Sequence, residues 1–428
     1  MMQNGFVSGT KFFSFEDNPV AQDVYQHTFP NGLTLLAERM EHVRSAAMNF
    51  RVPAGCVNDP PQHRGIASVL AEMITRGAGE RDSRQLSLDL DNLGFDRDES
   101  VGPMQISFWG STLARNLPAA LEIYADILQR PRLPEEELEP VRSLALQDIL
   151  SLEDEPRQKV LIELNQRHFP PPLGQDRRGT RAGIESLTPR IVRDHYSRLF
   201  QPRGAILSVA GKIEWEPLRD QVGRLFGDWK PGSEPELKLG ETPPPVEHIQ
   251  KETTQTQIGL AFPSVPFGHA DYYAALGAVN VLSGGMSARL FTEVREKRGL
   301  CYAVWATYKT FKDRACILCY AGTTNDRAQE TFDVTLAELH RLKDGIEEEE
   351  VERVRAGLKS SLIMQEESTS ARAGTLASDW YFLGRVRSFD EIQSAINSLT
   401  PESILGYVRR YPPRNFTIVT LGPKPLNV

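Results

Sequence analysis

Cysteine is scarce in this sequence, and long apolar runs are missing altogether. Four cysteines among 428 residues cannot form a disulfide framework. No apolar run approaches the roughly 18–20 residues that a membrane-spanning helix needs, so we expect no membrane protein. Residues 1–19 have no basic start followed by an apolar core, and they therefore do not resemble a secretory signal. We expect a cytoplasmic protein.

Positive charge is also in deficit. The chain carries 49 Lys and Arg residues against 57 Asp and Glu residues, a net charge of −8. This balance disfavours a nucleic-acid-binding surface and is more compatible with a cationic peptide ligand. The hydrophobic fraction of 40% and the charged fraction of 25% are those of a globular protein. The length favours two or more domains.

Two of the cysteines, Cys316 and Cys319, have the CxxC spacing of many metal and redox sites. They lie in the sequence ACILCYAG, which predicts a buried strand. Residues three apart in a strand point to opposite faces, and a structural zinc would need two further ligands nearby. We interpret both as core residues, with a metal or redox role as the alternative.

Proline, glycine and charge concentrate between Lys230 and Gln250. This composition predicts an extended linker that divides the chain nearly in half. We therefore predict a first domain of residues 1–230, a linker of residues 231–250 and a second domain of residues 251–428.

The two halves resemble each other in sequence. The acidic run at 135–142 recurs at 348–355, and the Ile-x-Ser-Leu-Thr-Pro segment at 184–189 recurs at 396–401. The offsets are 213 and 212 residues, and the two matches occur in the same order. A repeat of this length is a whole domain rather than a solenoid unit, so we predict duplicated domains.

Strands and helices interleave within each half. Residues 23–29 and 33–38 flank Pro-Asn-Gly and predict a β-hairpin, and residues 46–52 predict another strand. Residues 64–76 have apolar side chains at the spacing of one helix face, and long helices follow across 115–165. No regular βαβ order is present, so we predict an α+β fold with helices on a largely antiparallel sheet.

The predicted helix contains the sequence Gly-Ile-Ala-Ser-Val-Leu-Ala-Glu-Met at 65–73. It resembles the zinc helix of M16 (pitrilysin-like) zinc peptidases, which typically reads G-x-A-H-x-x-E-H-M. Ser68 and Glu72 stand at the two His positions, and Ala71 stands at the position of the catalytic Glu. The family's third ligand, a carboxylate, corresponds to Asp148.

These replacements predict a degenerate zinc site. A catalytic zinc needs three protein ligands, usually including imidazoles, and its water needs a nearby general base. This helix offers neither, so we expect no zinc in this chain. Glu72 and Asp148 are interpreted as paired or solvated charges, with a weakly held hard cation as the alternative. His63 matches no ligand position and is interpreted as a loop residue.

A second motif is intact. Residues 282–302 contain a Gly-rich turn at Gly284 and Gly285, followed by Arg295 and Tyr302 seven residues apart. They resemble the family motif whose Arg and Tyr reach the zinc site of another domain or subunit and bind the substrate carbonyl. Donors placed where negative charge develops can lower a barrier by on the order of 3–4 kcal/mol. The alternative is structural, since cations and glycine also end helices.

The resemblance covers nearly the whole chain. It implies a clam-shell of two duplicated domains, a zinc-bearing homologous partner subunit and a peptide substrate. It therefore implies the non-catalytic subunit of a heterodimeric M16 peptidase, with the zinc cofactor in the partner. One alternative is a catalytically dead scaffold, which would have no reason to keep Arg295 and Tyr302. The other is a self-associating homodimer that binds extended peptides at a sheet edge.

Overall fold

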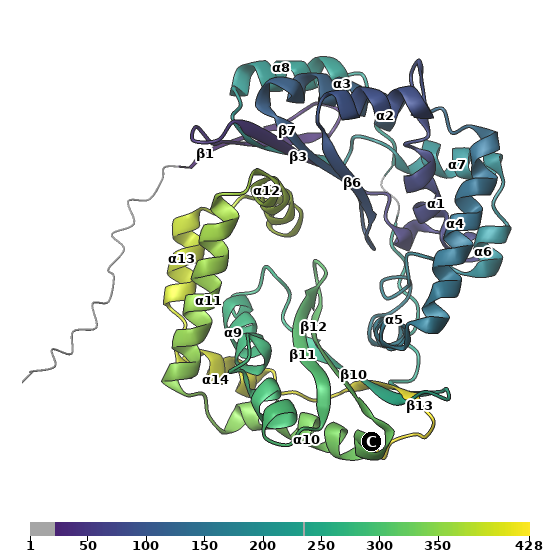
Figure 1. Ribbon diagram of the computed structural model, residues 1–428. Helices are drawn as coiled ribbons and strands as arrows, with labels where there is room; N and C mark the ends of the chain where they lie inside the picture. Colours follow the sequence, from purple (N-terminus) through teal and green to yellow (C-terminus); the bar gives the residue numbers. More distant parts are fainter. Residues whose placement is uncertain (1–21, 234–235) are drawn as a thin grey trace, which may run out of the picture.

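The chain folds into two α+β halves that face each other across a central space (Figure 1). The computed structural model describes residues 22–233 and 236–428, so the N-terminal segment considered above lies outside the described residues. The first sheet has the order β1 (Asp23–Thr28), β2 (Thr34–Arg39), β8 (Ile206–Gly211), β3 (Ser45–Val52), β7 (Ile106–Leu113), β6 (Asp96–Val101). The second has the order β11 (Cys301–Thr310), β12 (Ala315–Thr324), β10 (Gln255–Ser264), β13 (Thr417–Gly422), β9 (Val246–Gln250).

Helices cover both sheets. The first half contains α1 (Ile66–Met73), α2 (Ser83–Asn92), α3 (Leu117–Gln129), α4 (Leu138–Ser151), α5 (Pro156–His168), α6 (Arg181–Glu185), α7 (Pro189–Leu199) and α8 (Trp215–Phe226), and a short hairpin, β4 (Gly77–Ala78) with β5 (Arg81–Asp82). The second contains α9 (Tyr272–Ser283), α10 (Ala328–Arg341), α11 (Glu348–Glu366), α12 (Thr369–Leu383), α13 (Phe389–Asn397) and α14 (Pro401–Arg410).

The strand order confirms the predicted duplication and the largely antiparallel sheets. Five strands of the first sheet, β2-β8-β3-β7-β6, have the same order as β9-β13-β10-β12-β11 in the second. The only parallel pairs in these two described sheets are β2 with β8 and β9 with β13, which are equivalent in the duplication. The predicted hairpin is also confirmed, with Thr28 opposite Thr34.

One part of the predicted linker is a strand. Residues 246–250 form β9, which pairs with β13 at the edge of the second sheet. The second domain therefore begins at the end of the segment that we assigned to the linker. The error has a physical reason, because β9 is a half-exposed edge strand without the apolar alternation that marks a buried one.

The two halves exchange helices. Helix α5 of the first half lies on the second sheet, and α12 of the second half lies on the first sheet (Figure 1). On α5, His168 Nδ1 lies 2.9 Å from Thr417 Oγ1. Gly259 on β10 lets α5 approach closely, since a Cβ there would lie 2.8 Å from Val160.

Helix α12 is fixed to the first sheet by buried polar contacts. Arg372 Nε donates to the Glu38 carboxylate at 2.9 Å, and both side chains are almost fully buried. Ser208 Oγ donates to the Ala373 carbonyl at 2.7 Å, and Arg51 donates to the Gly374 carbonyl at 3.0 Å. Each half therefore contributes a helix to the other half's core.

The cysteines are core residues in the fold. All four are free thiols with buried side chains. Cys316 packs in the cluster that includes Val160 of α5, whereas Cys319 packs in the main core of the second half with Leu260. The two side chains therefore lie in separate clusters, as the strand geometry of the CxxC motif predicts.

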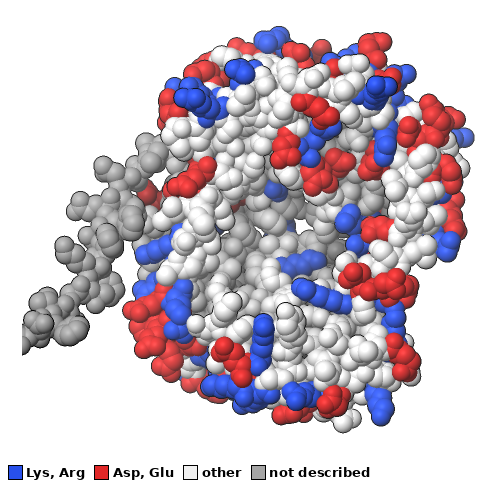
Figure 2. All heavy atoms as spheres, in the orientation of Figure 1, with Lys and Arg blue, Asp and Glu red and all other residues white. Residues whose placement is uncertain are grey.

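A hollow lies between the two halves, with Lys and Arg side chains visible inside it (Figure 2). The first core cluster lies between the first sheet and its helices, and the second lies between the second sheet and α9, α10, α11 and α14. Within residues 22–233 and 236–428, no helix is both long enough and apolar enough to cross a membrane.

Candidate functional site

Helix α1 carries Ser68, Ala71 and Glu72, three of the residues that we predict to be degenerate zinc positions. Gly65, with φ of +101°, begins the helix. The buried carboxylate of Asp59 accepts hydrogen bonds from the backbone N–H of Gly65 at 2.7 Å and of Ala67 at 3.2 Å. Burial raises the pKa of Asp59 to about 7. The apolar face of α1 is buried, so Ser68 and Glu72 lie on its more open side.

The four degenerate positions do not form a metal site. Ser68 Oγ donates to the backbone carbonyl of Arg177 at 2.7 Å. Ala71 is buried, and its methyl side chain cannot act as a general base. Glu72 pairs with Arg76 one turn away on the chain. Asp148 accepts from Arg178 at 3.0 Å.

The contacts of the two carboxylates favour their interpretation as paired charges. Glu72 and Asp148 are both paired with arginine, so neither is an open ligand for a hard cation. In the part of the chain that the structure describes, no group of three or more His, Cys, Asp and Glu side chains could hold a metal ion. His63 hydrogen-bonds Ser186 Oγ at 2.7 Å and belongs to the loop packing. The residues present here therefore do not fit a catalytic zinc.

The structure brings Arg295 and Tyr302 together. Arg295 lies in a π-helix (η6, Phe291–Glu296), and its guanidinium stacks between two rings, 4.8 Å from Phe291 and 5.1 Å from Tyr302. Tyr302 sits where the β11–β12 pairing slips between Cys301 and Ala303, so it lies on a bulge. Its side chain is 80% exposed. Bulges and π-turns often re-aim side chains at functional sites.

Both side chains keep their hydrogen-bond donors available. Among the described residues, neither the guanidinium of Arg295 nor the hydroxyl of Tyr302 has a hydrogen-bond or ion-pair partner, only the ring stacking. The neighbouring cations differ, since Lys297 and Arg298 both bind the Glu293 carboxylate. The pair therefore presents N–H and O–H donors to solvent.

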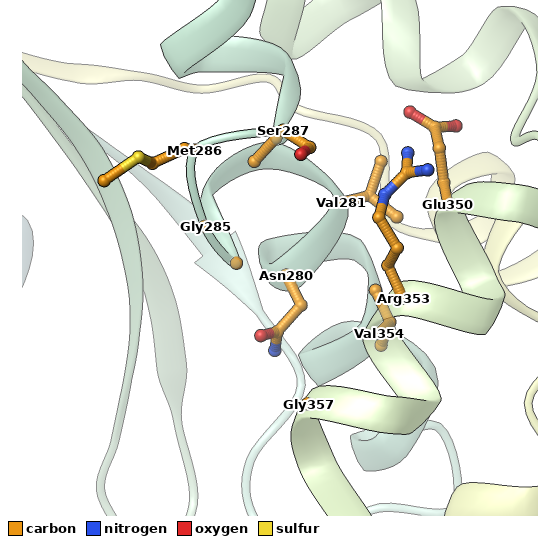
Figure 3. Close-up of a pocket in the computed structure, with 11 residues that line it drawn as sticks. Asn280, Val281, Gly285, Met286, Ser287, Glu350, Arg353, Val354 and Gly357 are labelled. Atoms are coloured by element: carbon orange, nitrogen blue, oxygen red, sulfur yellow. The ribbon is translucent and has the colours of Figure 1, made fainter. Parts of the chain in front are cut away.

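The Gly-rich turn lines a small pocket of about 140 Å³ between α9 and α11 (Figure 3). A Cβ at Gly284 would lie 2.6 Å from the Asn280 carbonyl oxygen, and Gly285 has φ of +154°, so both positions require glycine. Arg353 lines the opposite wall from α11 (Figure 3). Sequence reasoning missed Arg353, because nothing in its helical pattern distinguishes it from a solvated charge. Substrate binding at Gly284 and Gly285 stays a prediction.

Comparison with protein families decides the relationship. The family described as "Insulinase (Peptidase family M16)" matches residues 34–180. The family described as "Peptidase M16 inactive domain" matches residues 186–358. The chain belongs to the M16 peptidase family. The first match contains Ser68, Ala71, Glu72 and Asp148. The match to the inactive domain contains Arg295 and Tyr302.

Relatives named as zinc proteases match this chain along most of its length. An "Uncharacterized zinc protease" from Rickettsia bellii is 28% identical over 93% of this chain and 97% of that protein. The "Uncharacterized zinc protease YmxG" from Bacillus subtilis is 27% identical over 94% of this chain and 98% of that protein. Both relatives are named for zinc, whereas the described residues of this chain contain no group that could hold it.

Solved structures confirm the M16 fold. A peptidase M16 inactive domain from Pseudomonas fluorescens superposes with a TM-score of 0.86 at 18% identity, covering 95% of this chain and 99% of that one. A protease from Helicobacter pylori superposes with a TM-score of 0.85 at 20% identity, covering 95% and 100%. These similarities extend over both halves and support the two-domain α+β architecture.

Proposed function

We propose that this chain is the non-catalytic subunit of an M16-type zinc peptidase and completes the active site of a zinc-bearing homologous subunit. The observation that carries the proposal is an asymmetry between the halves. The first half has Ser68, Ala71 and Glu72 where a zinc site needs two imidazoles and a base. The second half presents Arg295 and Tyr302 as an exposed, adjacent donor pair.

The chemistry assigned to the pair is binding of the substrate carbonyl. When a nucleophile attacks a peptide bond, negative charge develops on the carbonyl oxygen, and preplaced donors stabilise it. Tyr302 supplies a neutral O–H group, and Arg295 supplies charged N–H groups that also attract the substrate backbone. Stacking of the guanidinium against the phenol ring, at 5.1 Å, limits the freedom of both side chains before substrate arrives. Zinc and its activated water belong to the partner in this proposal.

Two other functions compete with this one. The exposed Tyr302 lies on a bulge and stacks on Arg295. In the described chain, neither side chain has a hydrogen-bond partner. A scaffold role is disfavoured because it does not require this arrangement. A peptide-binding homodimer would use the same clam-shell and an edge strand, but it would need no zinc-bearing partner.

The test is to purify this chain alone, a zinc-bearing M16 homologue from the same genome alone, and the two together. We expect no stoichiometric zinc and no hydrolysis of an unstructured peptide by this chain, and faster, chelator-sensitive hydrolysis by the mixture than by the homologue. Elemental analysis and sedimentation report metal content and assembly independently of activity. One tightly held zinc per isolated chain, with activity lost to a chelator, would overturn the proposal. Self-association without complex formation would favour the homodimer.

A further inference from the structure

Another cavity, of about 290 Å³, lies where the two halves meet beside the linker. We call it the junction pocket. The first half contributes the start of β2, the start of β8, the loop after β3 and the β6–β7 turn. The second half contributes the end of α12 and the β11–β12 turn, and Leu237 of the linker completes the wall. A ligand in this cavity would therefore contact both halves at once.

The apolar walls of the junction pocket come from two separate clusters. On one side they belong to the cluster that α5 forms with the second sheet: Val57, Met104 and Leu237. On the other side they belong to the cluster between α12 and the first sheet: Ile206, Trp380 and Tyr381. The cavity thus lies between two apolar surfaces that do not fill it. An apolar ligand body would take this surface out of water and gain packing contacts on both sides.

The charged groups that line the junction pocket are all positive. Arg203 lines it from the first half and Lys312 from the second, and no Asp or Glu among the described residues lines it. Within residues 22–233 and 236–428, neither cation has a hydrogen-bond or ion-pair partner for its side chain. In the chain as a whole, acids outnumber Lys and Arg by 57 to 49. The pocket therefore attracts an anion, against the net charge of the molecule.

Both cations are carried by well-defined turns. Arg203 precedes Gly204, which has φ of +76°, and the Arg203 backbone packs so closely on Gly32 that a Cβ there would lie 3.0 Å from the Arg203 Cα. On the other wall, the Lys312 ammonium lies 4.9 Å from the centre of the Tyr381 ring. These contacts limit the freedom of the two cations without neutralising their charge.

We infer that the junction pocket binds a carboxylate carried on an apolar ring or branched chain. The apolar body would contact Ile206, Trp380 and Tyr381. The carboxylate would accept hydrogen bonds from Arg203 and Lys312. The volume is near the low end of the roughly 300–1,000 Å³ of small-molecule sites, so it admits one or two rings. Such a carboxylate occurs in free aryl acids and at the C-terminus of a peptide that ends in an apolar residue.

This inference concerns the chain by itself and needs neither zinc nor a partner, so it can fail while the proposed function holds. The probes are two pairs of compounds, and the members of each pair differ in charge. One pair is 2-naphthoate and 2-naphthamide, and the other is N-acetyl-Ala-Ala-Phe with a free carboxylate or with a C-terminal amide. Binding to the purified chain is measured by calorimetry at constant, near-physiological salt. We expect an acid to bind about tenfold more tightly than its amide, equivalent to about 1.4 kcal/mol.

Three variants locate the effect. Arg203→Gln and Lys312→Gln each remove one charge from an exposed side chain, so both variants should fold. Because the two cations share the tenfold preference for the acid, each change should reduce that preference about threefold. Lys212→Gln is the matched control, because Lys212 is exposed, has no ion pair in the described chain and follows the other end of β8, outside the pocket.

The two pairs of compounds separate the sources of the ligand. A preference for 2-naphthoate alone assigns the pocket to a small acid, and a preference for the peptide acid assigns it to a peptide C-terminus; both support a pocket for an apolar carboxylate. The inference is wrong if neither acid binds more tightly than its amide, or if the preference survives both Arg203→Gln and Lys312→Gln. A loss of the same size in Lys212→Gln would also contradict it, since the attraction would then be spread over the surface. Acetate carries the charge without the ring, and competition by acetate as strong as that by 2-naphthoate would refute the role of the apolar walls.

Discussion

The exchange of helices between the halves makes the Arg372–Glu38 ion pair a sensitive point of the fold. Arg372 is 1% exposed and Glu38 is 5% exposed. Two guanidinium nitrogens of Arg372 bond one carboxylate oxygen of Glu38, and the guanidinium lies 4.4 Å from the ring of Phe389. Arg372→Met keeps the apolar stem and removes the charge. Glu38 is then left buried with only a weak contact from Gln22, at 3.5 Å.

The expected cost follows from that uncompensated carboxylate. Breaking a buried pair by removing one partner typically costs about 3–5 kcal/mol. Glu38→Gln alone should also destabilise the chain, because the buried guanidinium loses its counterion. The double variant should recover part of the loss, with a coupling energy on the order of 2 kcal/mol.

The assay is urea unfolding followed by tryptophan fluorescence and by far-ultraviolet circular dichroism. Helix α12 belongs to one half and lies on the sheet of the other. In Arg372→Met, the unfolding transitions followed by fluorescence and by circular dichroism should therefore have different urea midpoints. A cost below about 1 kcal/mol, together with additivity in the double variant, would refute the idea that this pair locks the halves together.

Three further predictions test other parts of the fold. Burial, followed by the charge of Lys309, lowers the pKa of His168 to about 4. Between about pH 4 and 6.5 the unfolded chain therefore binds more protons than the folded chain, so the free energy of unfolding should fall on acidification. In urea titrations, His168→Gln should reduce this dependence on pH by up to about 1.4 kcal/mol per pH unit. Gly259→Ala should lower the thermal midpoint, because the new methyl would meet Val160 at 2.8 Å, whereas the same change at Gly357, where no atom lies within 4 Å, should not. All four buried cysteines should react with a thiol reagent only after denaturation, because burial raises their pKa values to about 11 or 12; fast labelling of a native thiol would contradict this.

Local patterns in the sequence predicted the elements well. The apolar spacing in residues 64–76 predicted α1 (Ile66–Met73), and the Pro-Asn-Gly turn predicted the first hairpin. The repeat offsets predicted two similar halves, which the common strand order confirms. The helix and the hairpin depend on residues that are close in the chain, and the repeat is visible by direct comparison of the two halves. A single sequence is therefore enough to predict these features.

Long-range arrangements were not predictable in the same way. The placement of α5 and α12 on the opposite sheets depends on contacts such as Arg372 with Glu38, 334 residues apart. The residues of the candidate site were located by motif. The stacking of Arg295 on Tyr302 and the bulge that exposes Tyr302 appear only once η6 and β11 are folded against each other.

The central claim is that Tyr302 and Arg295 act on the substrate in a partner's site. Its most direct test is the steady-state rate of the complex reconstituted with a zinc-bearing homologue and a peptide substrate. Tyr302→Phe should lower kcat on the order of 100-fold with little change in KM, because the hydroxyl meets charge that develops in the transition state. Arg295→Ala should lower kcat and also raise KM. Arg298→Ala, whose side chain binds Glu293 instead, should be nearly neutral. If Tyr302→Phe and Arg295→Ala both behave like Arg298→Ala in an intact complex, the pair is not catalytic and the scaffold function is favoured.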